Sequence, residues 1–204
     1  MPRSVLTARD LEAVADGGTL DLSPDTLITP LAREEAARRN ITFHFVEKSA
    51  GEVRRTVAIG ADHGGFELKE ILKEHLRSWG YAVLDQGTGS TNAVDYPDFA
   101  AAVAEAVVRG EAWCGVIIDS AGIGSSIAAN KVPGARAALC YDRVTARNSR
   151  EHNDANVLSL GAKLLSPEAA REILAVWLET PFGGGRHQKR IDKIIAIEKR
   201  YLKT

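Results

Sequence analysis

The stretch CGVIID (114–119) is an almost continuous apolar run, and SAGIGSS (120–126) follows it directly. Such a run is typical of a strand that is buried on both faces of a parallel sheet. In open α/β sheets, ligands bind beyond the carboxyl ends of the strands, and glycines there let the backbone approach a bound group closely. The stretch therefore predicts both a class of fold and the position of a binding site.

An alternation of strands and helices continues on both sides of this stretch. TVAIGA (56–61) is rich in strand-forming residues, and FELKEILKEHLRSWG (66–80) carries leucine and isoleucine at helical spacing. Further strands are predicted at 81–85, 135–140 and 155–160, and further helices at 98–109, within 120–131, and at 143–151, 167–179 and 186–202. The alternation predicts an α/β fold with a doubly wound, Rossmann-like sheet of five parallel strands.

Residues 1–52 have a different pattern, which predicts a small N-terminal extension of mixed helix and strand. TARD (7–10) is typical of a helix start, and TLDLS (19–23) alternates as a strand does. Thr29 is expected to cap a helix whose first residue is Pro30, a position where the missing N–H of proline costs nothing.

The polar stretch EKSAGEVRR (47–55) reads as a linker, so the main domain is expected to span 53–204. About fifty residues make a poor independent core. We therefore expect the extension to pack on another surface, which is its own main domain, a neighbouring subunit or another protein.

Composition and charge exclude several classes of protein. The chain has 204 residues, of which 45% are hydrophobic and 26% charged, so it is neither collagen-like nor wholly disordered. No run approaches the ~20 apolar residues of a membrane span, and the first residues lack the apolar region of a secretory signal. The net charge of −1 argues against a nucleic-acid partner. With two cysteines and no Cys/His cluster, we expect a cytoplasmic protein without a metal site.

Polar residues follow two of the predicted strands. Asp62 and His63 stand before two glycines at a helix start, which suggests polar groups near an anion site, although a capping Asp and a surface His fit equally well. Asp119 ends the apolar strand, where its carboxylate would act as a base or cap the next helix. Free N–H groups at that helix start, around Gly122 and Gly124, would hold an enediolate or a phosphate.

Two further places could carry chemistry. His152 lies ahead of the last strand and would move a proton near neutral pH, or it is a satisfied structural histidine. Arg186 and Arg190 are spaced to share one helix face after a run of glycines. They would grip a phosphate from one side, or they belong to a solvated basic helix.

Five segments together resemble one family of enzymes. They are ADHGGF (61–66), DYPDFA (95–100), GIGSSIAANKVPG (122–134), SREHNDANVLSLG (149–161) and GGRHQKRI (184–191). In order and spacing, from about residue 55 to 202, the chain resembles the ribose-5-phosphate isomerase B family, which includes subunits of galactose-6-phosphate isomerase. The first fifty residues lie outside the resemblance.

The resemblance implies an aldose–ketose isomerase that interconverts ribose 5-phosphate and ribulose 5-phosphate through a cis-enediolate, without a metal or an organic cofactor. It implies a homodimer or tetramer with active sites between subunits. His152 would assist ring opening with Asp95 nearby. Sugar hydroxyls would be bound by Asp62, Tyr96 and Asn153.

The resemblance also implies an anion hole and a phosphate site. The backbone from Ser120 through Gly122 to Gly124 would hold the enediolate. The phosphate would lie among His63, Lys163, Arg186, His187 and Arg190, with Lys163 at a position where the family commonly has an arginine.

The sequence departs from the family at three positions of the loop after the apolar strand. Asp119 stands where many members carry a catalytic Cys, Ser125 where another branch uses Glu, and Ala121 where a Thr is common. We expect Asp119 to replace the Cys as the base. The alternatives are a different substrate, namely a tetrose, deoxy or hexose phosphate, or a protein that binds sugar phosphates without catalysis.

Within the extension, LITPLARE (27–34) resembles short segments on some enzymes and accessory proteins of bacterial microcompartments. This implies a targeting or assembly segment with a shell or core partner, and a location inside such a compartment. The alternative is a structural arm that packs on the dimer. We expect no nucleic-acid and no membrane partner.

Overall fold

The computed structural model describes residues 5–22, 26–45 and 55–202. The chain divides into two compact units, Met1–Val53 and Arg54–Thr204. The predicted linker, 47–55, lies outside the described residues apart from Arg55.

The N-terminal unit combines two small parallel sheets with one α-helix. Its elements are β1 (Val5–Leu6), the 3₁₀ turn η1 (Ala8–Leu11), β2 (Thr19–Leu22), β3 (Leu27–Ile28), α1 (Pro30–Arg38) and β4 (Thr42–Phe45). β1 pairs with β3, and β2 pairs with β4. The Thr29 hydroxyl accepts the N–H of Ala32 at 3.3 Å, which confirms the predicted cap and the start of α1 at Pro30.

Two features of this unit differ from the predicted pattern. The helix predicted from TARD is only a short 3₁₀ turn, which begins with a capping box between Thr7 and Asp10. The chain turns again before it reaches Gly17, whose φ is +76°, so the helix does not extend to the predicted end. β4 is an additional element: its residues, TFHF, alternate as those of a strand do, although only Phe43 in it is even partly buried.

The larger unit is built on the predicted five-stranded sheet. Its elements are β5 (Thr56–Ala61), α2 (Phe66–Ser78), β6 (Ala82–Asp85), α3 (Tyr96–Val108), β7 (Cys114–Asp119), α4 (Ile123–Ala129), β8 (Ala137–Leu139), α5 (Arg143–Asn153), β9 (Val157–Gly161), α6 (Pro167–Glu179), η2 (Gly185–His187) and α7 (Gln188–Tyr201). The strand order is β6-β5-β7-β9-β8, and every pairing is parallel. This is the α/β fold that the alternation predicts.

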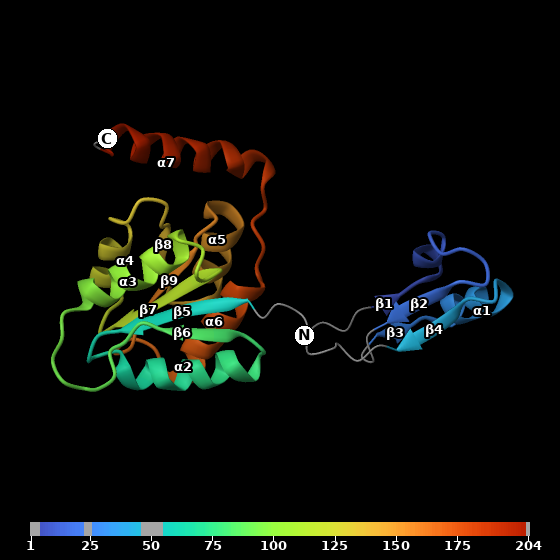
Figure 1. Cartoon of the computed structure of the whole chain (residues 1–204), viewed down its shortest axis with the longest axis horizontal. Helices are drawn as coiled ribbons and strands as arrows, with labels where there is room; N and C mark the ends of the chain where they lie inside the picture. Colours follow the sequence, from blue (N-terminus) through green and yellow to red (C-terminus); the bar gives the residue numbers. More distant parts are fainter. Residues whose placement is uncertain (1–4, 23–25, 46–54, 203–204) are drawn as a thin grey trace. The chain divides into compact units, whose positions relative to one another are not determined.

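Helices cover both faces of the sheet, as Figure 1 shows. Leu72 of α2 and Trp177 of α6 belong to the core on one face, and Ala104 of α3 belongs to the core on the other. All six residues of β7 are buried, because this strand is central and covered on both sides. The apolar run that suggested the fold is therefore the middle of the molecule's core.

An ion-pair network closes the β6 edge of the sheet. The ammonium group of Lys69, whose side chain is 1% exposed, donates to both oxygens of Asp85 at 2.8 and 2.9 Å. Lys73 also reaches Asp85, and Glu70 pairs with both lysines. Burial raises the pKa of Asp85, but hydrogen bonds from the two lysines outweigh it and hold the pKa below the ordinary value. Asp85 thus accepts hydrogen bonds from both lysines at this edge of the sheet.

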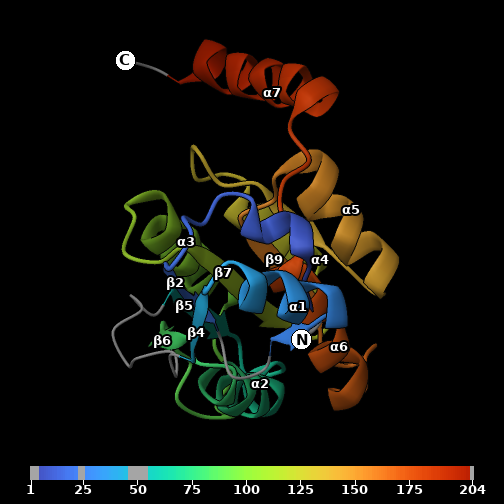
Figure 2. The same cartoon turned by 90° about the vertical axis from the view of Figure 1, so that its right-hand side faces the viewer.

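Helix α7 stands apart from the helices that cover the sheet, in the views of both Figure 1 and Figure 2. Only its first turn is buried, at Ile191, whereas Ile194, Ile197 and Tyr201 are 46%, 53% and 75% exposed. Among the residues that the structure describes, no helix is long and apolar enough to cross a bilayer.

Candidate active site

The sequence-predicted site residues fall into two groups at opposite edges of the sheet. Parallel strands place all their carboxyl ends at one edge and all their amino ends at the other. The carboxyl-edge group follows the strands and comprises Asp62, His63, Asp95, Tyr96, Asp119, Ser120, Gly122, Gly124 and Lys163. The amino-edge group comprises His152, Asn153, Arg186, His187 and Arg190.

Asp119 lies at the carboxyl end of β7, and its carboxylate is surrounded by donors. Oδ1 accepts the N–H groups of Ala121, at 2.8 Å, and of Gly122. Oδ2 accepts the N–H and the hydroxyl of Ser125, at 2.9 and 2.6 Å. An ionised carboxylate has about four lone-pair positions, so these donors saturate it. The side chain, whose residue is 5% exposed, therefore holds the loop and the start of α4 together.

The first turn of α4 still presents donors beside this carboxylate. Within the part of the chain that the structure describes, the N–H groups of Ile123 and Gly124 have no hydrogen-bond partner. A β-carbon on Gly124 would lie 2.5 Å from the Tyr96 ring, so the glycine lets that ring lie directly over the turn. The arrangement offers two N–H groups and a phenol to a small anionic ligand.

Asp62 and His63 stand beside the same loop. Asp62 is 7% exposed and accepts the Gly65 N–H at 3.0 Å, so it holds the turn before α2, whose N-cap residue is Gly65, and does not itself cap the helix. A β-carbon on Gly64 would come 2.5 Å from the Ser120 hydroxyl, which shows how closely the two loops approach. His63 is exposed, and its Nδ1 lies 3.1 Å from the carbonyl oxygen of Val94.

The remaining members of the carboxyl-edge group border this loop. Lys163 follows β9 and is tied to the loop by its N–H, which donates to the Ser120 carbonyl at 3.0 Å, while its side chain is exposed. Asp95 is the exposed N-cap residue of α3, next to Tyr96, and its side chain makes no capping hydrogen bond.

The amino-edge group is a cationic cluster. The rings of His152 and His187 stack with their centroids 4.2 Å apart. Nε of Arg186 lies 3.4 Å from Nε2 of His187 and a terminal guanidinium nitrogen of Arg190 lies 3.4 Å from its Nδ1, and the ring nitrogen that carries no proton accepts from its arginine. Burial lowers the pKa of His187, and its neighbours His152, Arg186 and Arg190 lower it further. Two guanidinium groups around a neutral imidazole form a pocket of positive charge that suits a phosphate.

The local structure of this cluster differs from the sequence expectation at two points. His152 and Asn153 form the last turn of α5 rather than a loop, because the helix continues until Asp154 adopts a left-handed conformation at φ +45°. Arg186 lies in η2 and only Arg190 in α7, so the two arginines meet at His187 rather than along one helix face.

The two groups lie too far apart in one chain to hold the same small molecule. His152 ends α5, which leads into the amino end of β9, and Gly161 at the other end of β9 pairs with Asp119. The six residues of β7 span about 20 Å at about 3.3 Å per residue. That is longer than a five-carbon sugar phosphate, so one such molecule cannot contact both groups of the same chain.

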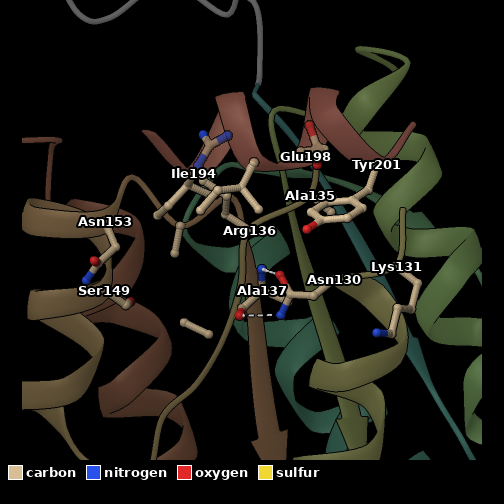
Figure 3. Close-up of a pocket in the computed structure, with 13 residues that line it drawn as sticks. Asn130, Lys131, Ala135, Arg136, Ala137, Ser149, Asn153, Ile194, Glu198 and Tyr201 are labelled. Carbon is tan, nitrogen blue, oxygen red and sulfur yellow. Dashed lines mark hydrogen bonds between the residues drawn. The ribbon is translucent and has the colours of Figure 1, made fainter. Parts of the chain in front are cut away.

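A cavity of about 620 Å³ lies beneath α7, next to the amino-edge group (Figure 3). Ile194, Ile197 and Tyr201 of α7 line one side, and Ala137 and Asn153 are among the residues opposite. The Gly134 N–H donates to the Glu198 carboxylate at 2.8 Å and ties α7 to the loop before β8. The cavity thus opens beneath the exposed apolar side of α7.

Sequence reasoning missed two residues that touch the carboxyl-edge group. Ser125 was noted only as a departure from the family, yet its hydroxyl binds Asp119. The hydroxyl of Tyr141, just after β8, donates to the Ala121 carbonyl at 3.0 Å. Both follow from the rule that site residues lie beyond the carboxyl ends of strands. Ser125 lies within the quoted segment GIGSSIAANKVPG (122–134), whereas Tyr141 belongs to none of the quoted segments.

Comparisons with known proteins identify the family of the larger unit. Residues 57–194 match the ribose/galactose isomerase family. The chain is 45% identical to the ribose-5-phosphate isomerase B of Escherichia coli over 146 residues, which cover 72% of this chain and 98% of that protein. It is 39% identical to the D-erythrulose-4-phosphate isomerase of Pectobacterium atrosepticum over 141 residues, which cover 68% of this chain and 92% of that protein.

Solved structures show the same relationship. The ribose-5-phosphate isomerase B of Clostridium thermocellum superposes with a TM-score of 0.71 at 50% identity, covering 72% of this chain and 99% of that one. The unmatched part of this chain corresponds to the N-terminal unit. The chain belongs to the ribose/galactose isomerase family and is a sugar-phosphate isomerase.

Proposed function

We propose that the protein interconverts ribose 5-phosphate and ribulose 5-phosphate through a cis-enediolate. The observation that carries the proposal is the loop after β7, which sets the Asp119 carboxylate beside the unpaired N–H groups of Ile123 and Gly124. Relatives that bear the name ribose-5-phosphate isomerase B at 45% and 50% identity support this choice of substrate.

In this proposal Asp119 takes the proton from C2 of the open-chain aldose and returns it to C1. The electron pair of the broken C–H bond forms the C1=C2 double bond of the enediolate, and the negative charge falls on O1. The proton of the O2 hydroxyl then passes to O1, so that C2 becomes the carbonyl carbon as the proton returns to C1. The N–H groups of Ile123 and Gly124 stabilise that charge. His152 would assist ring opening with Asp95 nearby, while Asp62, Tyr96 and Asn153 would bind sugar hydroxyls. No step requires a metal or an organic cofactor.

Asp119 accepts a proton only if one of its donors moves away. Three of the four donors are backbone N–H groups, and the fourth, the Ser125 hydroxyl, turns about one side-chain bond. A serine hydroxyl in the first turns of a helix has an alternative acceptor in the carbonyl four residues earlier. We infer that substrate binding turns the Ser125 hydroxyl away and frees a lone pair of Oδ2.

The complete site requires two copies of the chain. The carboxyl-edge group would supply the base and the anion hole, and the partner's amino-edge group would supply the ring-opening histidine and most of the phosphate ligands. The exposed apolar side of α7 and the cavity beneath it support a homodimer, because contiguous exposed apolar side chains commonly mark a surface that another protein chain covers. A tetramer would pair two such dimers.

The direct test uses the metal-free protein and ribose 5-phosphate in heavy water, followed by NMR. The proposal predicts that ketose appears and that deuterium enters at the exchanging carbon. If neither signal appears with ribose 5-phosphate, that substrate is wrong, whatever the role of the loop.

The phosphate cluster yields a prediction of its own. Replacing Arg190 with Ala removes one guanidinium from His187 and should raise the KM for ribose 5-phosphate roughly 10- to 100-fold, the range for a hydrogen bond to a charged group. Lys189→Ala, which removes an exposed cation from the next position, is the matched control. Equal KM values for the two variants would take Arg190 out of the phosphate site.

A second candidate substrate is a tetrose phosphate. The relative named D-erythrulose-4-phosphate isomerase and the altered loop, with Ala121 and Ser125, favour it. Specificity constants for D-erythrulose 4-phosphate and ribulose 5-phosphate, measured side by side, decide between the two substrates.

For the N-terminal unit we propose a targeting or assembly role with a shell or core partner, inside a bacterial microcompartment or elsewhere in the cytoplasm. Val5 and Leu27, which pair across two short strands, are 54% and 50% exposed, and Leu31 of α1 is 63% exposed. These side chains form an apolar surface on a unit that the matched relatives lack.

Deleting residues 1–52 separates this role from that of a structural arm. We expect the shortened enzyme to keep its kcat and KM within about a factor of two and its oligomeric state, because the relatives lack this segment. Steady-state kinetics and sedimentation provide the measurement. A fall in melting temperature together with dissociation of the oligomer would show that the extension braces the enzyme instead.

A further inference from the structure

One peptide unit in the loop after β7 is hydrogen-bonded at both ends. Its N–H, that of Gly122, donates to Oδ1 of Asp119. Its carbonyl, that of Ala121, accepts the hydroxyl of Tyr141 at 3.0 Å. Tyr141 comes from the segment after β8, twenty residues further along the chain, so two separate elements fix the orientation of this peptide.

Hydrogen bonds are needed to hold this peptide in one orientation, because steric contacts alone do not prevent it from rotating. Gly122 has φ +78°, and glycine populates both signs of φ with similar ease, so the peptide before it could rotate without a clash from a side chain at Gly122. A β-carbon on Gly161 would lie 2.6 Å from the Ala121 carbonyl oxygen, so glycine there makes room for the orientation that is observed.

The opposite orientation would disrupt the site. A rotated peptide would turn the Ala121 carbonyl towards Asp119 and withdraw one of the four donors from the carboxylate. Two negative oxygens would then face each other in a buried position, which is unfavourable. The orientation of this peptide therefore decides whether the carboxylate and the start of α4 are held as described.

We propose that Tyr141 is a positioning residue, which acts on Asp119 through the peptide between Ala121 and Gly122. This inference rests on the proposed function of the loop. Tyr141 is 41% exposed, so its ring contributes little to the core and its hydroxyl is the group that acts. Hydrogen bonds in series also polarise one another, which strengthens the bond from Gly122 to Asp119.

Tyr141→Phe removes only the hydroxyl and tests the proposal. We expect kcat for ribose 5-phosphate to fall roughly 3- to 10-fold, the effect of one net hydrogen bond, with KM unchanged within about a factor of two. Binding of a phosphorylated hydroxamate, whose planar anion imitates the enediolate, should weaken by a similar factor. Tyr81→Phe is the matched control, because within the described residues the Tyr81 hydroxyl has no hydrogen bond.

The same substitution in an Asp119→Asn background separates the inference from the proposed function. If Tyr141 acts through Asp119, the second substitution changes neither the residual turnover nor the binding of the hydroxamate. Equal kcat values for Tyr141→Phe and Tyr81→Phe overturn the proposal, and so does an undiminished Tyr141 effect in the double variant. Full activity of the Asp119→Asn variant would instead refute the proposal that Asp119 is the base. In that case the ratio of kcat for Tyr141→Phe to kcat for Tyr81→Phe shows whether the Tyr141 hydroxyl contributes to turnover.

Discussion

Replacing Asp119 with Asn is expected to lower kcat for ribose 5-phosphate roughly 10²- to 10⁴-fold, which is the range for loss of a general base. Two effects act together. The amide cannot accept the C2 proton, and its NH₂ group would face the N–H and the hydroxyl of Ser125 where the carboxylate now accepts both. Loss of turnover and loss of deuterium incorporation at C2, followed by NMR, measure the effect.

Asp119→Cys is the variant that distinguishes a base from a structural carboxylate. A thiolate can take the same proton, so this variant should keep measurable activity, and iodoacetamide should abolish that activity. The wild-type enzyme should resist iodoacetamide, because Cys114 and Cys140 are buried and burial raises the pKa of Cys114 to about 12. A fully active Asp119→Asn enzyme would remove Asp119 from the chemistry.

Replacing Asp85 with Ala should lower the free energy of unfolding by about 3 kcal/mol, near the lower end of the range for removing one partner of a buried ion pair. The substitution leaves the ammonium group of Lys69, whose side chain is 1% exposed, with Glu70 as its remaining acidic partner. Urea unfolding at one protein concentration measures the loss.

Glu70→Ala is the matched control, because Glu70 is 43% exposed and should contribute no more than about 1 kcal/mol. The pH dependence follows from the lowered pKa of Asp85. Its contribution is present in full above the ordinary value of 3.8 and is lost as the pH falls through the lower pKa of the folded state. The gap between wild type and Asp85→Ala should therefore close below pH 3.8, and a constant gap would contradict this role.

The elements that sequence predicts best are those with one strong local signal. The apolar run of β7 and the helix α6, which starts at Ser166 and Pro167, have the predicted bounds. The end of α5 was predicted too early, because Asp154 takes a left-handed conformation that pattern alone does not reveal in a non-glycine residue. Such boundaries depend on tertiary contacts.

In the candidate site, too, local sequence patterns predict some features, whereas others depend on tertiary contacts. The rule of carboxyl ends places Asp62 and Asp119 correctly beside the glycine loop. The number of donors around Asp119 depends on the path of that loop through Gly122, which residue types do not determine. Tyr141 lies outside every motif, so only the fold brings its hydroxyl to the loop.

The order of the strands and helices along the chain is enough to predict that the two groups of residues lie at opposite edges of the sheet. His152 precedes the last strand and Asp119 ends a neighbouring one, so parallel strands must separate them. The resemblance implied active sites between subunits. The structure supplies a physical argument for that expectation, because the length of a strand exceeds that of the substrate.

Complementation between two inactive variants tests the central claim most directly. Asp119→Asn and His152→Ala are prepared as separate homodimers, then unfolded and refolded together. If each site takes Asp119 from one copy and His152 from the other, mixed dimers carry one intact site. About a quarter of the wild-type activity should then return, because half of the dimers are mixed and each has one good site of two. If activity stays at the sum of the two homodimers, Asp119 and His152 do not serve one site across two copies.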